Sequence, residues 1–436
     1  MDSTRIQKNP DDFRQRRLFR MVLWILLLLA AGEFLLRGPV RYLRPTKWDD
    51  LAQYYAASRL WLRGQNFAKP ENFVALWRDE VEGTLGAETM RTHIAPPPGA
   101  LVLLAPIGSL PWAAARIAWL AVLLGSFIAT VISLIRIAGL SPREPRTLVF
   151  ITACLALAPF HTGIASANQT ILVAGLCAVG ICVARHGRDT AAGLLFGAAC
   201  SMKPHVAAFV VLYYLIRRRW RLFATAVGFT LFLVAVAAGW MEINGIHWVQ
   251  DYISNIRFGS TKNIVDDFTT ANPSRFLLIN LQVPLFSITH DRQSANIIAL
   301  SVGCLLVVWW IALTLRMRGK ESELLSLATI AVIGLLPLYH RFYDASILAI
   351  PISWCISQWA SPTRHVVKAS MILMIPFSLP AAALLQEETF RGHVPQPWIH
   401  TWWWNCVVMP HQTWLLSALS LTLLYGMKTI AKSATK

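Results

Sequence analysis

Four short groups of polar side chains lie between the long apolar runs of this 436-residue chain. The first contains Asp49 and Asp50, followed by Tyr54 and Tyr55. If this segment is helical, Asp50 and Tyr54 lie one turn apart on the same face. A carboxylate beside aromatic rings suits a general base that removes a proton from a substrate hydroxyl. Aspartate is also a preferred helix N-cap, so capping is the alternative explanation for Asp50.

Amide and ammonium groups make up the second and third groups. Asn168 and Gln169 precede an apolar run that begins at Thr170, where amides bind sugar hydroxyls or cap a helix. Lys203 lies between two short apolar segments, and short or broken membrane helices often line a binding site. Its ammonium is a compact point charge suited to a phosphate. The alternative is a lysine that extends along the helix to lipid headgroups.

The fourth group is the turn at residues 338–344. His340 and Arg341 can bind a phosphate or leaving group through charge-assisted hydrogen bonds. An interfacial aromatic belt with an Arg–Asp pair explains the same residues equally well. The adjacent acids Asp266 and Asp267 are too few to predict a metal site, so none is predicted. The sequence has no Walker-type loop, Rossmann fingerprint or HExxH motif, and no cofactor is expected.

Composition indicates an integral membrane protein. Of all residues, 55% are hydrophobic and 14% are charged, whereas a soluble domain has about a quarter charged. Several apolar runs approach the 20 or so residues that a membrane helix requires. The formal charge is +17, but most basic residues fall in short loops between apolar runs, where they set topology. We therefore expect membrane lipids as partners and no nucleic acid.

Hydropathy and the positions of Lys and Arg predict an all-α, polytopic membrane protein of about 12 spans, with both termini in the cytoplasm. All four polar groups then fall on the extracytoplasmic side. The long outer loops contain aromatic residues and Asn, so we expect them to carry interfacial helices. We predict a single domain of residues 1–436. It begins with a first span at 18–36 and an outer loop at 38–95, followed by spans 2–7 in 96–241, which include a re-entrant piece at 96–111. The rest comprises an outer loop at 242–292, spans 8–11 in 293–386, an outer loop at 387–411 and a last span at 412–430.

These motifs, in this order, resemble those of glycosyltransferase family 87 of the GT-C superfamily. The matching elements are Asp50-Leu51-x-x-Tyr54-Tyr55, Pro96-Pro97, Asn168-Gln169 and Ala192-Gly193 through Met202-Lys203-Pro204 to Arg217-Arg218-Arg219-Trp220. The resemblance implies a GT-C-type fold in a bacterial inner membrane. It also implies transfer of a sugar, with mannose the first candidate, from a polyprenyl-phosphate donor to a lipid or glycan hydroxyl on the extracytoplasmic side.

The resemblance also implies roles for individual residues. Asp50 is the expected catalytic base, with its neighbour Asp49 as the alternative. A lipid phosphate leaves as a stable anion, so one carboxylate is enough and direct displacement inverts the sugar carbon. Cations would stabilise the departing phosphate. The donor phosphate is expected at Lys203, His340 and Arg341, and the substrates at Asp49, Tyr54, Tyr55, Asn168, Gln169 and Tyr343.

Two other classes of function fit parts of the sequence. A transporter or flippase for a lipid-linked sugar would concentrate polar groups at mid-membrane. Here those groups gather at one surface, although Glu33 lies inside the first predicted span. A non-catalytic assembly subunit is the third class, and binding without sugar transfer would favour it.

Overall fold

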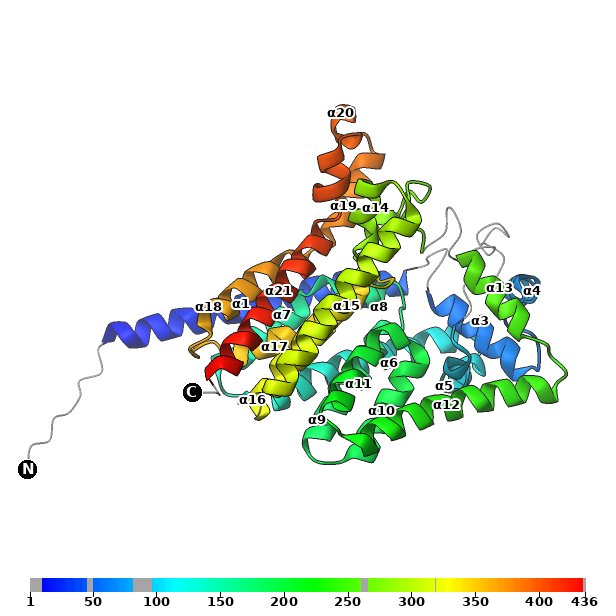
Figure 1. Ribbon diagram of the computed structural model, residues 1–436, viewed down its shortest axis with the longest axis horizontal. Helices are drawn as coiled ribbons and strands as arrows, with labels where there is room; N and C mark the ends of the chain where they lie inside the picture. Colours follow the sequence, from blue (N-terminus) through cyan, green and yellow to red (C-terminus); the bar gives the residue numbers. More distant parts are fainter. Residues whose placement is uncertain (1–9, 45–49, 81–95, 260–265, 318, 434–436) are drawn as a thin grey trace, which may run out of the picture.

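A computed structural model describes residues 10–44, 50–80, 96–259, 266–317 and 319–433 (Figure 1). Throughout these residues the regular structure is helical, and the one β-bridge joins Leu278 to Arg341 outside any strand. The prediction of an all-α chain is confirmed. Lipid offers no hydrogen-bond partners to a bare backbone, which is why a chain with this apolar content forms helices.

Five described helical segments are long and apolar enough to cross a membrane. Two further pairs of helices would each form a span bent at a short break, by 44° in the first pair and 41° in the second. The chain is therefore a multi-pass membrane protein. The five segments lie in α1 (Pro10–Arg37) continuing into α2 (Pro39–Leu43), α6 (Trp112–Ile137), α12 (Trp220–Ile243), α15 (Arg292–Arg316) and α21 (His411–Ser433). The bent pairs are α7 (Pro145–Ala156) with α8 (Ala158–Ala165), and α18 (Arg364–Met374) and η4 (Ile375–Ser378) with α19 (Ala381–Phe390).

Shorter helices complete the bundle. Which of them cross the membrane stays a prediction, and so does the count of about 12 spans. One of them, α5, has 11 residues and is about 16 Å long, too short for a core of about 30 Å. It lies within the predicted re-entrant piece. The others are α9 (Thr170–Arg185), α10 (Asp189–Met202), α11 (Pro204–Ile216), α16 (Lys320–Gly334), η3 (Phe342–Leu348) and α17 (Ala349–Ser357), with α5 itself at Pro98–Gly108.

Helices of the two longest predicted outer loops pack together at one end of the molecule, on the right of Figure 1. They are α3 (Asp50–Leu62) and α4 (Pro70–Glu80) of the first loop and α13 (Val249–Gly259) of the second. The second loop also contains η2 (Arg275–Leu277) and α14 (Gln282–Thr289), and α14 lies near the top of Figure 1, where it packs against α15. Phe67, which lies between α3 and α4, contacts the rings of Trp248 and Tyr252. Asn66 donates a hydrogen bond to Asp251 at 2.7 Å. The second loop thus packs directly on the first.

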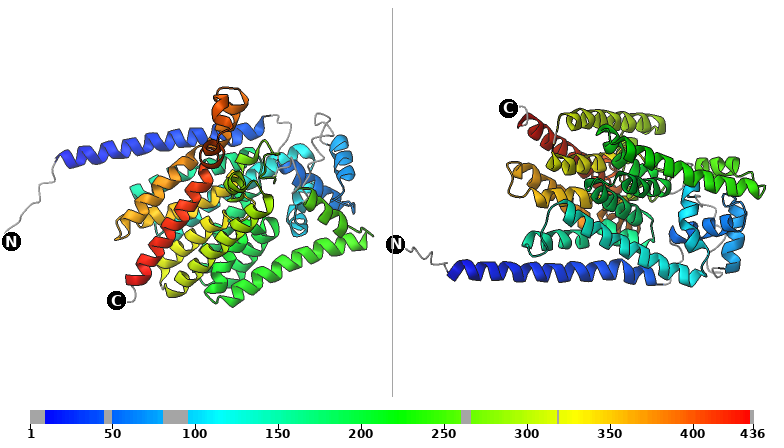
Figure 2. Two further views of the ribbon diagram at one scale, coloured as in Figure 1. Left: turned by 45° about the horizontal axis from the view of Figure 1, so that its top comes forward. Right: turned by 90° about the horizontal axis from the view of Figure 1, so that it is seen from below.

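The third predicted outer loop forms a projection that rises from the bundle, shown in orange in Figures 1 and 2. It contains the end of α19, then α20 (Gln396–Ile399) and the π-helical turn η5 (Trp404–Val408). The described start of α1 and the end of α21 lie toward one common side, on the left of Figure 1, while α3 lies at the opposite end. Which side of the membrane each end faces stays a prediction.

Candidate active site

Helix α3 positions Asp50 at the edge of the bundle. The backbone N–H of Asp50 donates to the carbonyl of Ser166 at 2.9 Å, which holds the start of α3 against the end of α8. Farther along α3, the indole of Trp61 donates to the carbonyl of Ala237 in α12 at 3.1 Å. The Tyr54 ring lies one turn after Asp50 and is buried. The helix that the sequence predicted is therefore formed, with its aromatic face inside.

Asn168 joins Asp50 to the start of α9. Its side-chain Nδ2 donates to a carboxylate oxygen of Asp50 at 2.6 Å and lies 3.4 Å from the Tyr54 hydroxyl. Its Oδ1 accepts from the backbone N–H of Thr170, two residues farther on, at 2.9 Å, as in an Asx turn. Ala167 turns the chain between α8 and α9 with φ = 58°. One amide thus bonds the first N–H of α9 and also orients the Asp50 carboxylate, a role that the sequence did not suggest.

A buried ion pair lies on the other side of Thr170. The Lys203 ammonium donates to the Asp344 carboxylate, and the two side chains are only 7% and 0% exposed. Lys203 also donates to the Thr170 hydroxyl at 2.7 Å. That hydroxyl lies 2.6 Å from both Asn168 Oδ1 and Asp344 Oδ1, and its single proton bonds one of them at a time. Lys203 therefore points into the protein and does not extend to headgroups.

Asp344 also accepts hydrogen bonds from residues of its own turn. His340 Nδ1 lies 3.2 Å from Asp344 Oδ2, and the backbone N–H of Arg341 donates to the same oxygen at 3.1 Å. Buried charges persist when they are paired and hydrogen-bonded, which these contacts achieve. The Lys203 ammonium also lies 4.8 Å from the centre of the Tyr343 ring. A residue from another segment also holds this turn, because the N–H of Ile279 donates to the His340 carbonyl at 3.0 Å.

Burial changes the acidity of two carboxyl groups near this network. Loss of water raises the pKa of Asp50 above its usual value, although the Asn168 hydrogen bond and the charges of Arg341 and Lys203 partly oppose the rise. A raised pKa makes Asp50 a stronger base than a solvated aspartate. Burial likewise raises the pKa of Asp266 to about 6, against the lowering effect of Arg341.

Asp266→Asn is expected to stabilise the protein at neutral pH. An acid whose pKa is higher in the folded state than in the unfolded state favours folding below the unfolded value, and that contribution is lost as the pH rises through about 6. Removing the charge should increase the free energy of unfolding at pH 7.5 by up to about 3 kcal/mol, with little gain near pH 4. Thermal unfolding of both proteins at the two pH values measures this; an equal shift at both would contradict it.

The structure brings together most of the predicted site residues. Asp50, Tyr54, Asn168, Lys203, His340, Arg341 and Tyr343 all belong to or adjoin the network described above. Two do not participate. The Tyr55 hydroxyl donates to the Leu110 carbonyl at 3.0 Å, and the Gln169 amide donates to the Met202 carbonyl at 3.0 Å. Asp49 lies outside the described residues.

Sequence reasoning missed two members of the network, Asp344 and Thr170. Asp344 had been paired with Arg341 in the alternative explanation of the turn, whereas the structure pairs its carboxylate with Lys203. The sequence did contain a signal for the pairing of Lys203 with Asp344. Lys203 and Asp344 are opposite charges next to apolar segments on the same predicted side, and such charges are stable in a bundle when they meet. Thr170 gave no signal beyond its place after Asn168.

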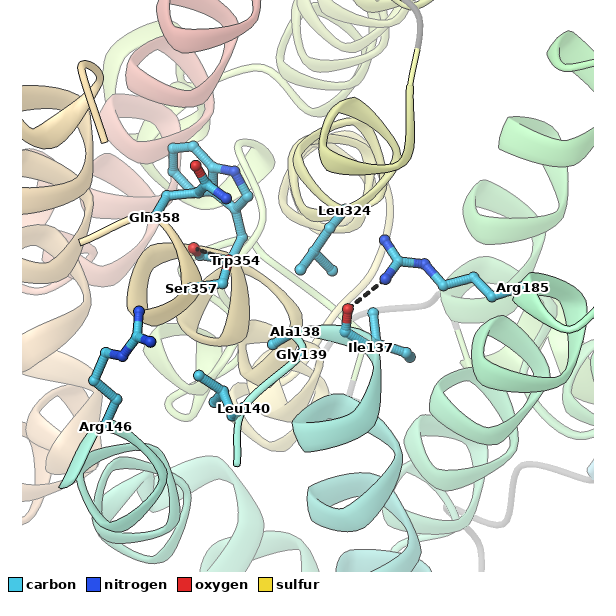
Figure 3. Close-up of a pocket in the computed structure, with 10 residues that line it drawn as sticks. All are labelled: Ile137, Ala138, Gly139, Leu140, Arg146, Arg185, Leu324, Trp354, Ser357 and Gln358. Carbon is cyan, nitrogen blue, oxygen red and sulfur yellow. Dashed lines mark hydrogen bonds between the residues drawn. The ribbon is translucent and has the colours of Figure 1, made fainter. Parts of the chain in front are cut away.

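A polar cavity of about 330 Å³ lies elsewhere, and Figure 3 shows its lining. Its residues come from the ends of α6, α9 and α17 and from the start of α7 and α16, and none is a predicted site residue. Helix α9 runs from Thr170 at the candidate site to Arg185 at this cavity, a length of about 24 Å. Arg185 donates to the carbonyl of Ile137 and pairs with Glu323 at 2.9 Å. The cavity is therefore separate from the candidate site.

Comparisons with known proteins bear on the family of the chain. A search of curated proteins finds no match. Among solved structures, the crystal structure of ArnT from Cupriavidus metallidurans in the apo state aligns over 97% of this chain and 77% of its own, with 14% sequence identity and a TM-score of 0.35. A TM-score this low does not establish a common fold.

A family model gives the decisive comparison. The model described as glycosyltransferase family 87 matches residues 96–338, more than half of the chain. The matched range includes Asn168 and Lys203, begins after Asp50 and ends before His340. With this match over an all-helical, multi-pass chain, the protein belongs to glycosyltransferase family 87 and is a membrane glycosyltransferase.

Proposed function

We propose that this enzyme transfers a sugar, with mannose the first candidate, from a polyprenyl-phosphate donor to a hydroxyl of a lipid or glycan acceptor. The transfer takes place on the extracytoplasmic face of a bacterial inner membrane and inverts the sugar carbon. One observation carries the proposal: the Asp50 carboxylate is held by Asn168 beside the buried cluster of Lys203 and His340. A base and cations for an anionic leaving group thus occur together.

The proposed step is a direct displacement. Asp50 takes the proton from the acceptor hydroxyl as its oxygen forms a bond to the anomeric carbon. The bond from that carbon to the phosphate oxygen breaks, and its electron pair leaves with the phosphate. Lys203, His340 and Arg341 stabilise the charge that develops there. No second carboxylate is required, because a phosphate leaves without protonation, unlike the alkoxide that a glycosidase must protonate.

An apolar groove on the helical bundle suits a lipid chain. A groove of about 220 Å³ lies between α6 and α9, lined by Val122, Gly125 and Leu172 among others. Leu172, Gly175, Leu176 and Val179 line it from α9. The prenyl chain of the donor would lie against the apolar outer faces of the spans, and the sugar would lie under the two long outer loops.

The donor class is tested with purified enzyme and radiolabelled substrates. We expect transfer of label from polyprenyl-phosphate mannose to an acceptor lipid, and none from GDP-mannose, because no nucleotide-binding motif occurs in the sequence. Reaction products are separated by thin-layer chromatography, and the anomeric configuration is assigned by NMR. Transfer from the nucleotide sugar, or retention at the anomeric carbon, would contradict the proposal. Lipid analysis of cells without the enzyme would identify the acceptor.

The flippase alternative loses its main support in the first span. Glu33 forms an ion pair with Arg37 at 3.0 Å, one turn away on the same helix. An acid neutralised by its own helix is not evidence of a substrate path. The two functions differ in a reconstituted vesicle: a flippase moves labelled lipid between leaflets without changing it, whereas the proposed enzyme releases the lipid phosphate. A non-catalytic subunit would bind the lipid and do neither.

A further inference from the structure

Two imidazole rings face each other beside the Lys203–Asp344 pair. The ring centroids of His205 and His340 are 4.9 Å apart, with the planes at 60°. The Nε2 atoms of both rings are buried, and neither has a hydrogen-bond partner within the described part of the chain. His340 is completely buried. An unsatisfied buried nitrogen costs free energy, so a ligand that forms hydrogen bonds with both rings would be stabilised there.

The charges around the rings decide what kind of ligand this is. One ligand atom from each of His205, His340 and Asp344 lies within 4.8 Å of the others, a spacing that suits a metal ion. Asp344, however, already accepts hydrogen bonds from Lys203, His340 Nδ1 and the Arg341 backbone. A divalent cation would have to enter beside an ammonium group with its only carboxylate occupied. The same charges attract an anion.

We propose that the Nε2 atoms of His205 and His340 together bind the phosphate of the lipid-linked donor and of the lipid phosphate product, beside Lys203. This inference rests on the proposed function and extends it to His205, which the sequence did not single out. The two rings approach the phosphate from different elements, His205 from α11 and His340 from the turn before η3. The break between α10 and α11 at Lys203-Pro204 is what places His205 there.

Each ring needs a hydrogen on Nε2 to donate to a phosphate. His340 Nδ1 faces Asp344, a carboxylate surrounded by donors, so this nitrogen carries a hydrogen. Nε2 can then donate to a phosphate only when the ring is an imidazolium. His205 can donate from Nε2 as a neutral ring. The charged and titratable groups that interact with the two rings are Lys203, Tyr339 and Asp344.

The test uses the purified full-length enzyme in detergent and farnesyl phosphate as the probe, with farnesol as its uncharged counterpart. We expect isothermal titration calorimetry to detect farnesyl phosphate and no comparable binding of farnesol. His205→Leu should weaken farnesyl phosphate binding by about tenfold or more, because one hydrogen bond to a charged group is lost. His205→Gln keeps an N–H group near the ε position and should recover most of the affinity.

A variant of His340 separates this role from a structural one. His340→Asn keeps a donor for Asp344 but removes the ε nitrogen, so farnesyl phosphate binding should weaken while the unfolding temperature stays close to that of the wild type. The exposed His393 provides a control, and His393→Leu should bind as the wild type does. Thermal unfolding of each variant verifies the fold.

Several results would overturn the inference. Unchanged affinity in a folded His205→Leu variant would remove His205 from the phosphate site. Loss of binding in EDTA that Mn²⁺ restores would instead assign the two histidines to a metal. The proposed function can fail separately. Phosphate binding through the histidines without any sugar transfer would leave the inference intact, while transfer that depends on Asp50 but not on His205 would contradict the inference alone.

Discussion

Asp50→Asn should reduce sugar transfer by about a thousandfold while leaving the fold intact. A positioned general base contributes roughly 10²–10⁴ in rate, and an amide cannot take the proton of the acceptor hydroxyl. Asparagine has nearly the same shape and can still form a hydrogen bond with Asn168, which contacts the carboxylate at 2.6 Å. The loss should appear in kcat and leave farnesyl phosphate binding close to that of the wild type. Initial rates with polyprenyl-phosphate mannose measure it.

Two further variants make this result specific. Asp291→Asn changes an aspartate that caps α15 far along the chain from the network, and transfer should continue at the wild-type rate. Asp49→Asn addresses the neighbouring acid, and a larger loss there than at Asp50 would move the role of base to Asp49. Transfer that survives in a folded Asp50→Asn protein would remove Asp50 from the mechanism.

Lys203→Met should both destabilise the protein and abolish transfer. The ammonium is the charged partner of a carboxylate that is 0% exposed, so its removal leaves Asp344 buried with a net charge. Breaking a buried pair on one side costs about 3–5 kcal/mol. The product phosphate would also lose a cation from its site. Thermal unfolding and transfer assays on the same preparations measure the two effects.

A double variant separates the two effects. Lys203→Met with Asp344→Asn removes both charges, and replacing a buried pair by neutral groups is often close to neutral for stability. We expect the double variant to regain most of the lost stability but none of the activity. Recovery of transfer together with stability would show that Lys203 acts only through the fold. A single Lys203→Met variant that unfolds at the wild-type temperature would contradict the buried ion pair itself.

The parts of the structure that the sequence predicted are those set by local pattern. Apolar runs predict helices long enough to cross a membrane, and α6 and α21 are two such helices, because the length of a membrane helix follows from bilayer thickness. The face of α3 with Asp50 and Tyr54 follows from helical periodicity alone. Lys203 was singled out because it lies at a break between helices, and the structure places it in the centre of the network.

What the sequence left open depends on contacts between distant segments. Asp344 lies 141 residues from Lys203, and no local pattern reveals which of several cations an acid will meet in a helical bundle. The side chains of Gln169 and Asn168 are adjacent and chemically alike. Gln169 nevertheless donates to a backbone carbonyl at the end of α10, whereas Asn168 donates to the Asp50 carboxylate. The packing of α9 against α10 and the position of Asp50 at the start of α3 distinguish them.

The proximity of Arg341 and Lys203 to Asp50, close enough for both to lower its pKa, has a consequence for turnover. In the proposed reaction Asp50 loses its negative charge at the moment when the lipid phosphate gains one. The same two cations face both groups, so the electrostatic balance of the pocket is preserved from Michaelis complex to product. Because no counterion has to enter or leave, catalysis can proceed in surroundings almost without water, where an uncompensated charge would be most costly.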